Sequence, residues 1–273
     1  MSRKFALFLS FACLAVIAAL TVACGKSASN NIFKTCTGGP YNVVGDWQIT
    51  VQDNGGGSIT GYGAIDSSGL ALFFDNNALA NSTGDTLQLP QLTGACSFSG
   101  NLTAYAAPNP LGSTVVTDPV QGNFSSATSM SASFTGSPSG TISANPFIPL
   151  SGSPTAFSGS PFTGEVNGSF SLGGVLLQLN FTPTGTGASM TFTALPSQNC
   201  AVTGSFTQQS SSNVFDVTMT FSGLGCPITT TSALTGLGFE SNTDYFSMNG
   251  GAAGTYLYAD MLNGSNTFVM EIF

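Results

Sequence analysis

Positive charge is almost missing from this chain. The sequence has no histidine and only four basic residues, so Lys, Arg and His are all absent after Lys34. Those four are Arg3, Lys4, Lys26 and Lys34. Nucleic-acid binding needs cations that displace the counterions around phosphates, so the region after Lys34 is excluded from that class. The same absence excludes mechanisms that need an imidazole base, a Schiff-base lysine or the lysine of a phosphate-binding loop.

Charge of either sign is scarce as well, because only 6% of the residues are charged. Hydrophobic residues make up 42% of the chain, which is normal for a folded globular protein and argues against disorder. Carboxylates, amides, hydroxyls and aromatic rings are the groups that remain for chemistry or binding. We therefore expect a protein that is not an enzyme and that has no cofactor, no metal site and no nucleic-acid partner.

The N-terminus has the layout of a secretory signal peptide. Arg3 and Lys4 precede an apolar stretch at residues 5–22, and the small residues Ala23 and Gly25 follow. The apolar stretch is also close to the length that spans a bilayer as a helix. An uncleaved membrane anchor is therefore the alternative interpretation.

The end of this leader, Thr21-Val22-Ala23-Cys24, resembles the lipobox of bacterial lipoproteins, although that family usually has Leu where this chain has Thr21. The resemblance implies cleavage before Cys24, lipidation of Cys24, and a membrane partner bound through that N-terminal lipid. Gly25 is similar to the residue found in outer-membrane lipoproteins. We therefore expect an exported envelope protein with a signal peptide at residues 1–23 and a lipid-anchored tether at residues 24–34. An ordinary cleavage site followed by a free cysteine is the alternative.

Four cysteines follow the leader, and an even number in an exported chain predicts disulfides, with three connectivities possible. They are Cys36, Cys96, Cys200 and Cys226. We favour Cys36–Cys96 and Cys200–Cys226, because the second pair brackets an expected hairpin at residues 201–208 and 214–221. A four-cysteine metal site is the alternative, but the chain has no C-x-x-C spacing.

Alternation with a period of two indicates β-strands throughout the rest of the chain. Trp47, Ile49 and Val51 alternate with polar residues, and so do the apolar residues at 130–134 and 217–221. Turn signals rich in Asp, Asn, Ser and Gly occur at residues 53–57, 66–69 and 263–265. Short turns favour antiparallel order, so we predict an all-β fold of the barrel or sandwich type.

An internal repeat divides the chain. Residues 96–103 align with 200–207, and Ile59-Thr60-Gly61 aligns with Phe162-Thr163-Gly164 at nearly the same offset. A proline-rich segment at residues 146–161 separates the halves. We predict two repeated β domains of about eight strands each, at residues 35–145 and 162–273, joined by that linker. One continuous pseudo-symmetric barrel or sandwich is the alternative.

Gly45-Asp46-Trp47 contains the only tryptophan and resembles the G-x-W motif of lipocalins. That resemblance implies an eight-stranded barrel that carries a small ligand, with Trp47 closing one end. In lipocalins an arginine covers the tryptophan, and this chain has no arginine beyond Arg3. A tryptophan that fills the core of a β domain is the alternative.

Residues 239–246 form the densest cluster of acidic, amide and aromatic residues, and they include Glu240, Asp244 and Tyr245. The two carboxylates suggest glycoside hydrolysis or Ca²⁺ binding, and Tyr245 or Tyr256 suggests a sugar-stacking surface. A solvated loop is the simpler interpretation. The leading hypothesis is a non-catalytic, lipid-anchored envelope protein that is structural or binds a small molecule, a glycan or another envelope protein. A carbohydrate-binding module or a carboxylate-dependent glycosidase is the alternative.

Overall fold

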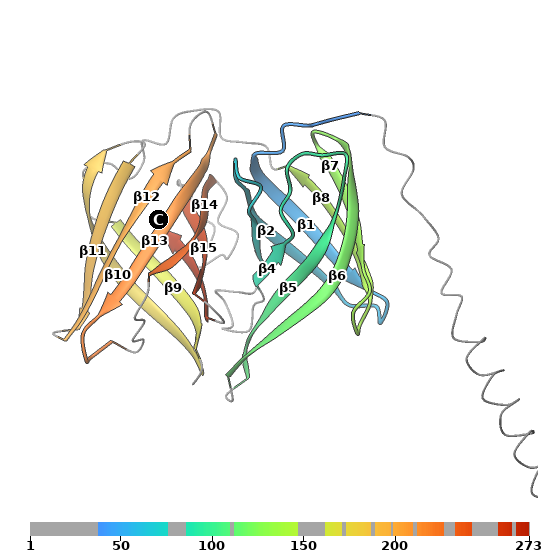
Figure 1. The fold of residues 1–273 in the computed structure, drawn as a ribbon. Helices are drawn as coiled ribbons and strands as arrows, with labels where there is room; N and C mark the ends of the chain where they lie inside the picture. The colour runs from blue at the N-terminus through green and yellow to red at the C-terminus, as the bar shows by residue number, and fades with distance from the viewer. Residues whose placement is uncertain are drawn as a thin grey trace, which may run out of the picture. The chain divides into compact units, whose positions relative to one another are not determined.

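The computed structural model describes residues 38–75, 86–109, 112–146, 162–170, 173–186, 189–197, 199–209, 212–226, 233–241, 256–263 and 266–272. In these ranges the strands form two closed antiparallel barrels of eight strands each (Figure 1). The predicted all-β fold of two barrel-like units is therefore confirmed. No helix in the same ranges has the length and apolar character needed to span a membrane. The leader, with Cys24, lies outside the described residues.

Barrel 1 follows chain order around its circumference, and its last strand pairs with its first. Its strands are β1 (Gly45–Asp53), β2 (Ser58–Ile65), β3 (Ala71–Asp75), β4 (Thr86–Leu89), β5 (Ser97–Asn109), β6 (Gly112–Ser126), β7 (Ser129–Phe134) and β8 (Gly140–Pro146). Pro146 ends β8 and lies opposite Trp47 of β1. The remainder of the predicted linker, residues 147–161, lies outside the described residues.

Barrel 2 repeats this order, and its last strand, β16, pairs with its first, β9. Its strands are β9 (Phe162–Phe170), β10 (Gly173–Thr186), β11 (Ser189–Ser197), β12 (Cys200–Gln208), β13 (Val214–Ser222), β14 (Leu234–Ser241), β15 (Tyr256–Asn263) and β16 (Asn266–Ile272). The predicted sequence repeat aligns β2 with β9 and β5 with β12, so it runs one strand out of step with the strand order. In a closed barrel such a shift keeps every pair of neighbours together.

Two predicted turns join the first strands of barrel 1. Between β1 and β2, an Asp53 carboxylate oxygen accepts a hydrogen bond from the Gly57 amide at 2.8 Å. Between β2 and β3, one carboxylate oxygen of Asp66 accepts from the amides of Ser68 and Leu70, both at 2.8 Å. These contacts are the self-capping turns typical of Asp, and they hold consecutive strands antiparallel.

Side chains fill the interior of barrel 1, and Trp47 lies among them with 1% of its surface exposed. Its indole N–H donates to the Val43 carbonyl oxygen at 2.8 Å. Its ring contacts Phe124 edge to face, with centroids 6.0 Å apart and planes at 70°. The alternation predicted at residues 130–134 is confirmed, because Met130, Ala132 and Phe134 are all buried in this core. The interior therefore has the character of a packed β core built around Trp47.

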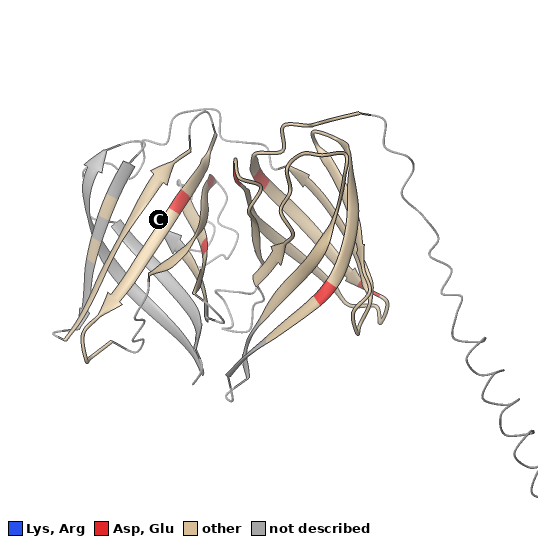
Figure 2. Cartoon of the chain, in the orientation of Figure 1, with Lys and Arg blue, Asp and Glu red and all other residues tan. Residues whose placement is uncertain are grey.

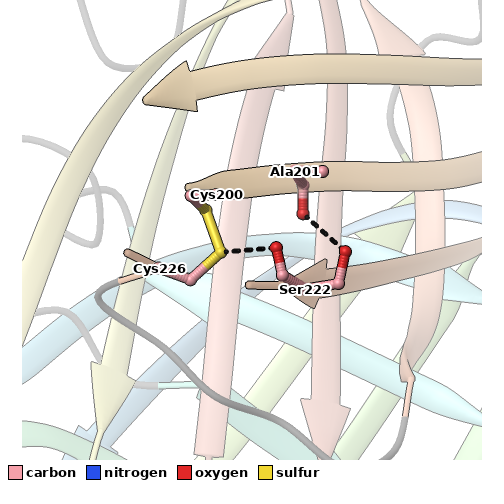
Figure 3. The surroundings of a disulfide bond; sticks show 4 residues. All are labelled: Cys200, Ala201, Ser222 and Cys226. Carbon is pink, nitrogen blue, oxygen red and sulfur yellow. Dashed lines mark hydrogen bonds between the residues drawn. A yellow bond between two sulfur atoms is a disulfide. The ribbon is translucent and has the colours of Figure 1, made fainter. Parts of the chain in front are cut away.

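The β12–β13 hairpin of barrel 2 has nearly the predicted bounds, and a disulfide joins Cys200 to Cys226 (Figure 3). Beside it, Cys226 Sγ lies 3.2 Å from the Ser222 carbonyl oxygen, and the Ser222 hydroxyl donates to the Ala201 carbonyl at 3.4 Å. The predicted pairing of these two cysteines is confirmed. Cys96 is also disulfide-bonded, but Cys36 lies outside the described residues, so its pairing with Cys96 stays a prediction.

Candidate functional site

Buried and exposed side chains do not alternate along the strands where the two barrels meet. Every residue of β3, Ala71–Asp75, is buried, and so are the first six residues of β15, from Tyr256 to Met261. On β3, Phe73 belongs to the core of barrel 1, whereas its neighbour Phe74 packs in a second cluster. A strand buried on both faces has packing partners on both sides of its sheet. For β3 and β15, the second partner is the other barrel.

We call this second cluster the joint. It contains outward-facing residues of both barrels, each at most 5% exposed. Its members are Ala64, Leu72 and Phe74 from barrel 1, and Val214, Leu237, Phe239, Tyr256, Tyr258 and Val269 from barrel 2. Burial of so many apolar side chains stabilises the contact between the barrels, because each one removes apolar surface from water.

Aromatic rings form the centre of the joint. Phe74 of barrel 1 stacks on Phe239 of barrel 2, with centroids 6.0 Å apart and planes at 6°. Tyr258 lies 6.1 Å from Phe74 and 5.6 Å from Phe239, measured between centroids. Aromatic pairs of this kind contribute about 0.5–1.5 kcal/mol each beyond their buried area.

Asp260 of β15 lies beside the joint, on the same face of the strand as Tyr258, and only 1% of its surface is exposed. The Thr86 hydroxyl of barrel 1 donates to its Oδ1 at 3.1 Å, whereas its Oδ2 has no hydrogen-bond partner within the described part of the chain. Burial raises the pKa of Asp260 well above its ordinary value, and the hydrogen bonds from Thr86 and the Met261 amide offset this only in part. The protonated acid is therefore the form that the joint favours.

A second polar contact crosses between the barrels at Asp46. The Asn213 amide nitrogen of barrel 2 donates to Asp46 Oδ1 at 2.6 Å. Burial raises the pKa of Asp46, against the opposing effect of this hydrogen bond. A third contact runs from the Ser67 amide of barrel 1 to Gln209 Oε1 of barrel 2, at 3.0 Å.

Glu240 lies inside barrel 2 and not in the joint. On β14 it follows Phe239 of the joint, and it is paired with Leu257 of β15, so it points to the opposite face of the sheet. Burial alone raises the pKa of Glu240 to about 7. Figure 2 shows acids without any Lys or Arg on the coloured part of the chain. In that part no three acidic or cysteine residues cluster as a metal site would require.

The structure separates the predicted binding residues. Trp47 lies in the core of barrel 1, Tyr256 in the joint, and Glu240 inside barrel 2, and none is more than 7% exposed. Asp244 and Tyr245 lie outside the described residues, so a convergence of Asp244 with Glu240 stays a prediction. Binding roles for the other three stay predictions as well. In this structure their side chains are buried and are not accessible to a ligand.

The sequence interpretation missed Asp260, Thr86 and the joint that they bridge. The signal that could have found the joint is the loss of alternation in two short segments, Ala-Leu-Phe-Phe at residues 71–74 and Tyr-Leu-Tyr-Ala-Asp-Met at 256–261. A run of apolar residues of strand length indicates a strand covered on both faces. Thr86 itself gives no such signal, because an isolated threonine is common on any strand.

Comparison with protein-family models, with curated proteins and with solved structures found no match for this chain.

Proposed function

We propose that this chain is an exported, lipid-anchored, non-catalytic envelope protein whose double barrel is structural or binds another envelope component. The observation that carries the proposal is that four of the carboxylates have structural hydrogen-bond partners. Asp53 and Asp66 shape turns, and Asp46 and Asp260 connect one barrel to the other. These hydrogen bonds give the four acids structural roles, which supports a non-catalytic protein.

The aromatic residues support the same proposal over sugar binding. A carbohydrate-binding surface needs exposed rings, but Trp47 and Tyr256 are each 1% exposed. Among the residues whose side-chain exposure the structure describes, the large hydrophobic side chains that are exposed are aliphatic, namely Val115, Val116 and Leu224.

The glycosidase alternative needs a second carboxylate about 5–10 Å from the first. A carboxylate so close would itself raise the pKa of Glu240 by repulsion. Among the described residues burial is the only cause of the raised pKa of Glu240. No carboxylate within the described part of the chain therefore forms such a pair with Glu240, and its pairing with Asp244 stays a prediction.

The anchor is tested by replacing Cys24 with Ser in the native host. We expect wild type in the membrane fraction, with acyl chains on Cys24 detected by mass spectrometry of the N-terminal peptide. Cys24→Ser should lose the acyl chains and leave the membrane fraction. Cys13→Ser, which makes the same change within the leader, is the matched control and should behave as wild type. A mature protein without acyl chains on Cys24 would refute the lipid anchor.

The binding role is tested separately, by native mass spectrometry of the protein purified from its own membranes. A co-purifying envelope protein supports the partner-binding role, and bare lipidated protein supports a structural role. Hydrolysis of a glycan by the same preparation, abolished by Glu240→Gln, would overturn the non-catalytic assignment.

A further inference from the structure

Burial of Asp260 in the contact between the barrels is energetically unfavourable. A carboxyl with one orphaned oxygen is costly to bury, and a pair of apolar residues would pack the same contact at lower cost. Turn formation explains Asp53 and Asp66, but no turn or cap accounts for Asp260, which lies in the middle of β15 (Tyr256–Asn263). Neither the lipid anchor nor the proposed envelope role requires an acid there.

We infer that the joint is a pH-operated latch: the two barrels pack together while Asp260 is protonated and separate when it ionises. The geometry supports separation as two intact units, because each barrel closes through its own strand pairing. Opening breaks the cross-barrel hydrogen bonds Thr86–Asp260, Asn213–Asp46 and Ser67–Gln209. No strand pairing of either barrel has to break.

None of the described groups that face Asp260 carries a positive charge that could compensate its ionised form. Thr86 on β4 donates to it. The pKa of the Tyr105 phenol on β5 is raised, first by burial and second by the charge of Asp260. In the strand register, Leu237 of β14 and Val269 of β16 lie opposite Asp260.

Other titratable groups on or beside the joint within the described ranges are Tyr62, Tyr256 and Tyr258, and the acids Asp46, Asp75, Asp216 (through Gln209), Glu271 and Glu165. In the register Glu271 lies opposite Tyr258 on one side and Glu165 on the other. All of them are neutral or negative, and the sequence has no cation after Lys34. An ionised Asp260 can therefore be stabilised only by exposure to water.

The direction of the pH effect follows from the raised pKa values of the two acids that accept hydrogen bonds across the barrels, Asp260 and Asp46. Burial raises the pKa of Asp260 and of Asp46 in the closed joint, and water restores ordinary carboxyl values when it opens. Packing of the two barrels is therefore favoured at acidic pH. It becomes less favourable as the pH rises above the ordinary pKa range of carboxyl groups. Each acid that titrates in this way multiplies the opening constant by up to tenfold per pH unit.

Pulsed hydroxyl-radical footprinting of the full exported protein tests the latch, with oxidation read by mass spectrometry across a pH series. We expect oxidation of Phe74, Phe239 and Tyr258 to rise with pH by up to tenfold per unit. Trp47 and Met261, buried inside barrels 1 and 2 at 1% and 0% exposure, should stay protected. Equal exposure of joint and interior residues at the same pH would show global unfolding and overturn the latch.

Two variants assign the effect to Asp260. Asp260→Asn keeps an acceptor for Thr86 but cannot ionise, so the pH dependence of joint oxidation should fall by at least tenfold over two pH units. Asp53→Asn makes the same chemical change in the β1–β2 turn and should leave the dependence unchanged. A wild-type pH dependence in Asp260→Asn would overturn the proposal.

A third variant covers the case in which Asp260→Asn does not fold. Thr86→Val removes the cross-barrel donor at similar volume, and should raise joint oxidation roughly tenfold at low pH while Trp47 stays protected. Unchanged joint oxidation in Thr86→Val would mean that this contact does not hold the barrels together, and would also overturn the latch.

Discussion

The two barrels have the same strand order but different interiors. In barrel 1, Trp47 packs against Phe124 among mainly aliphatic side chains. The described interior of barrel 2 has Phe206 and Phe221 beside Met219 and Met261, and it also holds the acid Glu240 and a disulfide at one end of the β12–β13 hairpin. Closure of a barrel thus fixes which strands are neighbours but leaves the composition of the core free.

The largest expected effect concerns the core of barrel 1 around Trp47. Trp47→Ala should destabilise barrel 1 by about 3–5 kcal/mol, because it leaves a large cavity and an unpaired Val43 carbonyl. Calorimetry and circular dichroism should show an early transition from barrel 1 and a later one from barrel 2. Trp47→Phe, which keeps a ring but loses the hydrogen bond, should cost less. A single unchanged transition in Trp47→Ala would contradict this account of the core.

The next largest effect is expected from removal of the Cys200–Cys226 disulfide in barrel 2. Replacing Cys200 and Cys226 together with Ser frees a loop whose ends are 26 residues apart, which corresponds to about 3–4 kcal/mol of loop-closure entropy. Urea unfolding should show the loss in barrel 2, while Trp47 fluorescence reports an unchanged barrel 1. Equal losses in both barrels would show that the disulfide acts on the whole unit.

Glu240 should make barrel 2 sensitive to pH. Its pKa rises from 4.5 to about 7 in the folded state, so the folded state binds a proton more tightly than the unfolded chain. Stability should therefore be highest below pH 4.5 and fall by about 3 kcal/mol as pH rises to 7. Glu240→Gln should reduce this fall in the free energy of unfolding, as measured by urea titrations at several pH values. A wild-type pH profile in that variant would show that another group titrates.

The smallest effect compares one glycine in each barrel. A Cβ at Gly63 would collide with the Leu72 carbonyl, and a Cβ at Gly236 would collide with the Asp260 carbonyl. Each Ala substitution should cost about 1–3 kcal/mol through overpacking, in barrel 1 for Gly63 and in barrel 2 for Gly236. Gly61→Ala, where the nearest atoms lie at 3.0 and 3.1 Å, is the milder control. Thermal unfolding that follows both barrels would check the assignment.

Sequence patterns were sufficient for the parts of the fold that depend on local chemistry. Asp66 and Gly69 identify a turn because a carboxylate can cap nearby amides and glycine adopts the positive φ of 86°. Val217, Met219 and Phe221 identify a strand with one buried face, and all three are buried. The spacing of Cys200 and Cys226 around their hairpin was enough to pair them.

The joint could not be located in the same way, because it depends on contacts between distant segments. Thr86 and Asp260 are 174 residues apart, and nothing local in either one specifies the other. Tyr256 and Glu240 look like surface binding residues when a single sheet face is assumed buried. They are buried because β14 and β15 have one face toward the barrel interior and the other toward the joint.

Closure has a further consequence for a chain with so few charges. Proteins with open sheets commonly use lysines and other charged side chains to keep exposed strand edges from pairing with other molecules. Here each of the sixteen described strands has a neighbour on both sides. Barrels that contain no lysine can therefore stay free of strand-to-strand aggregation, even at high protein concentration.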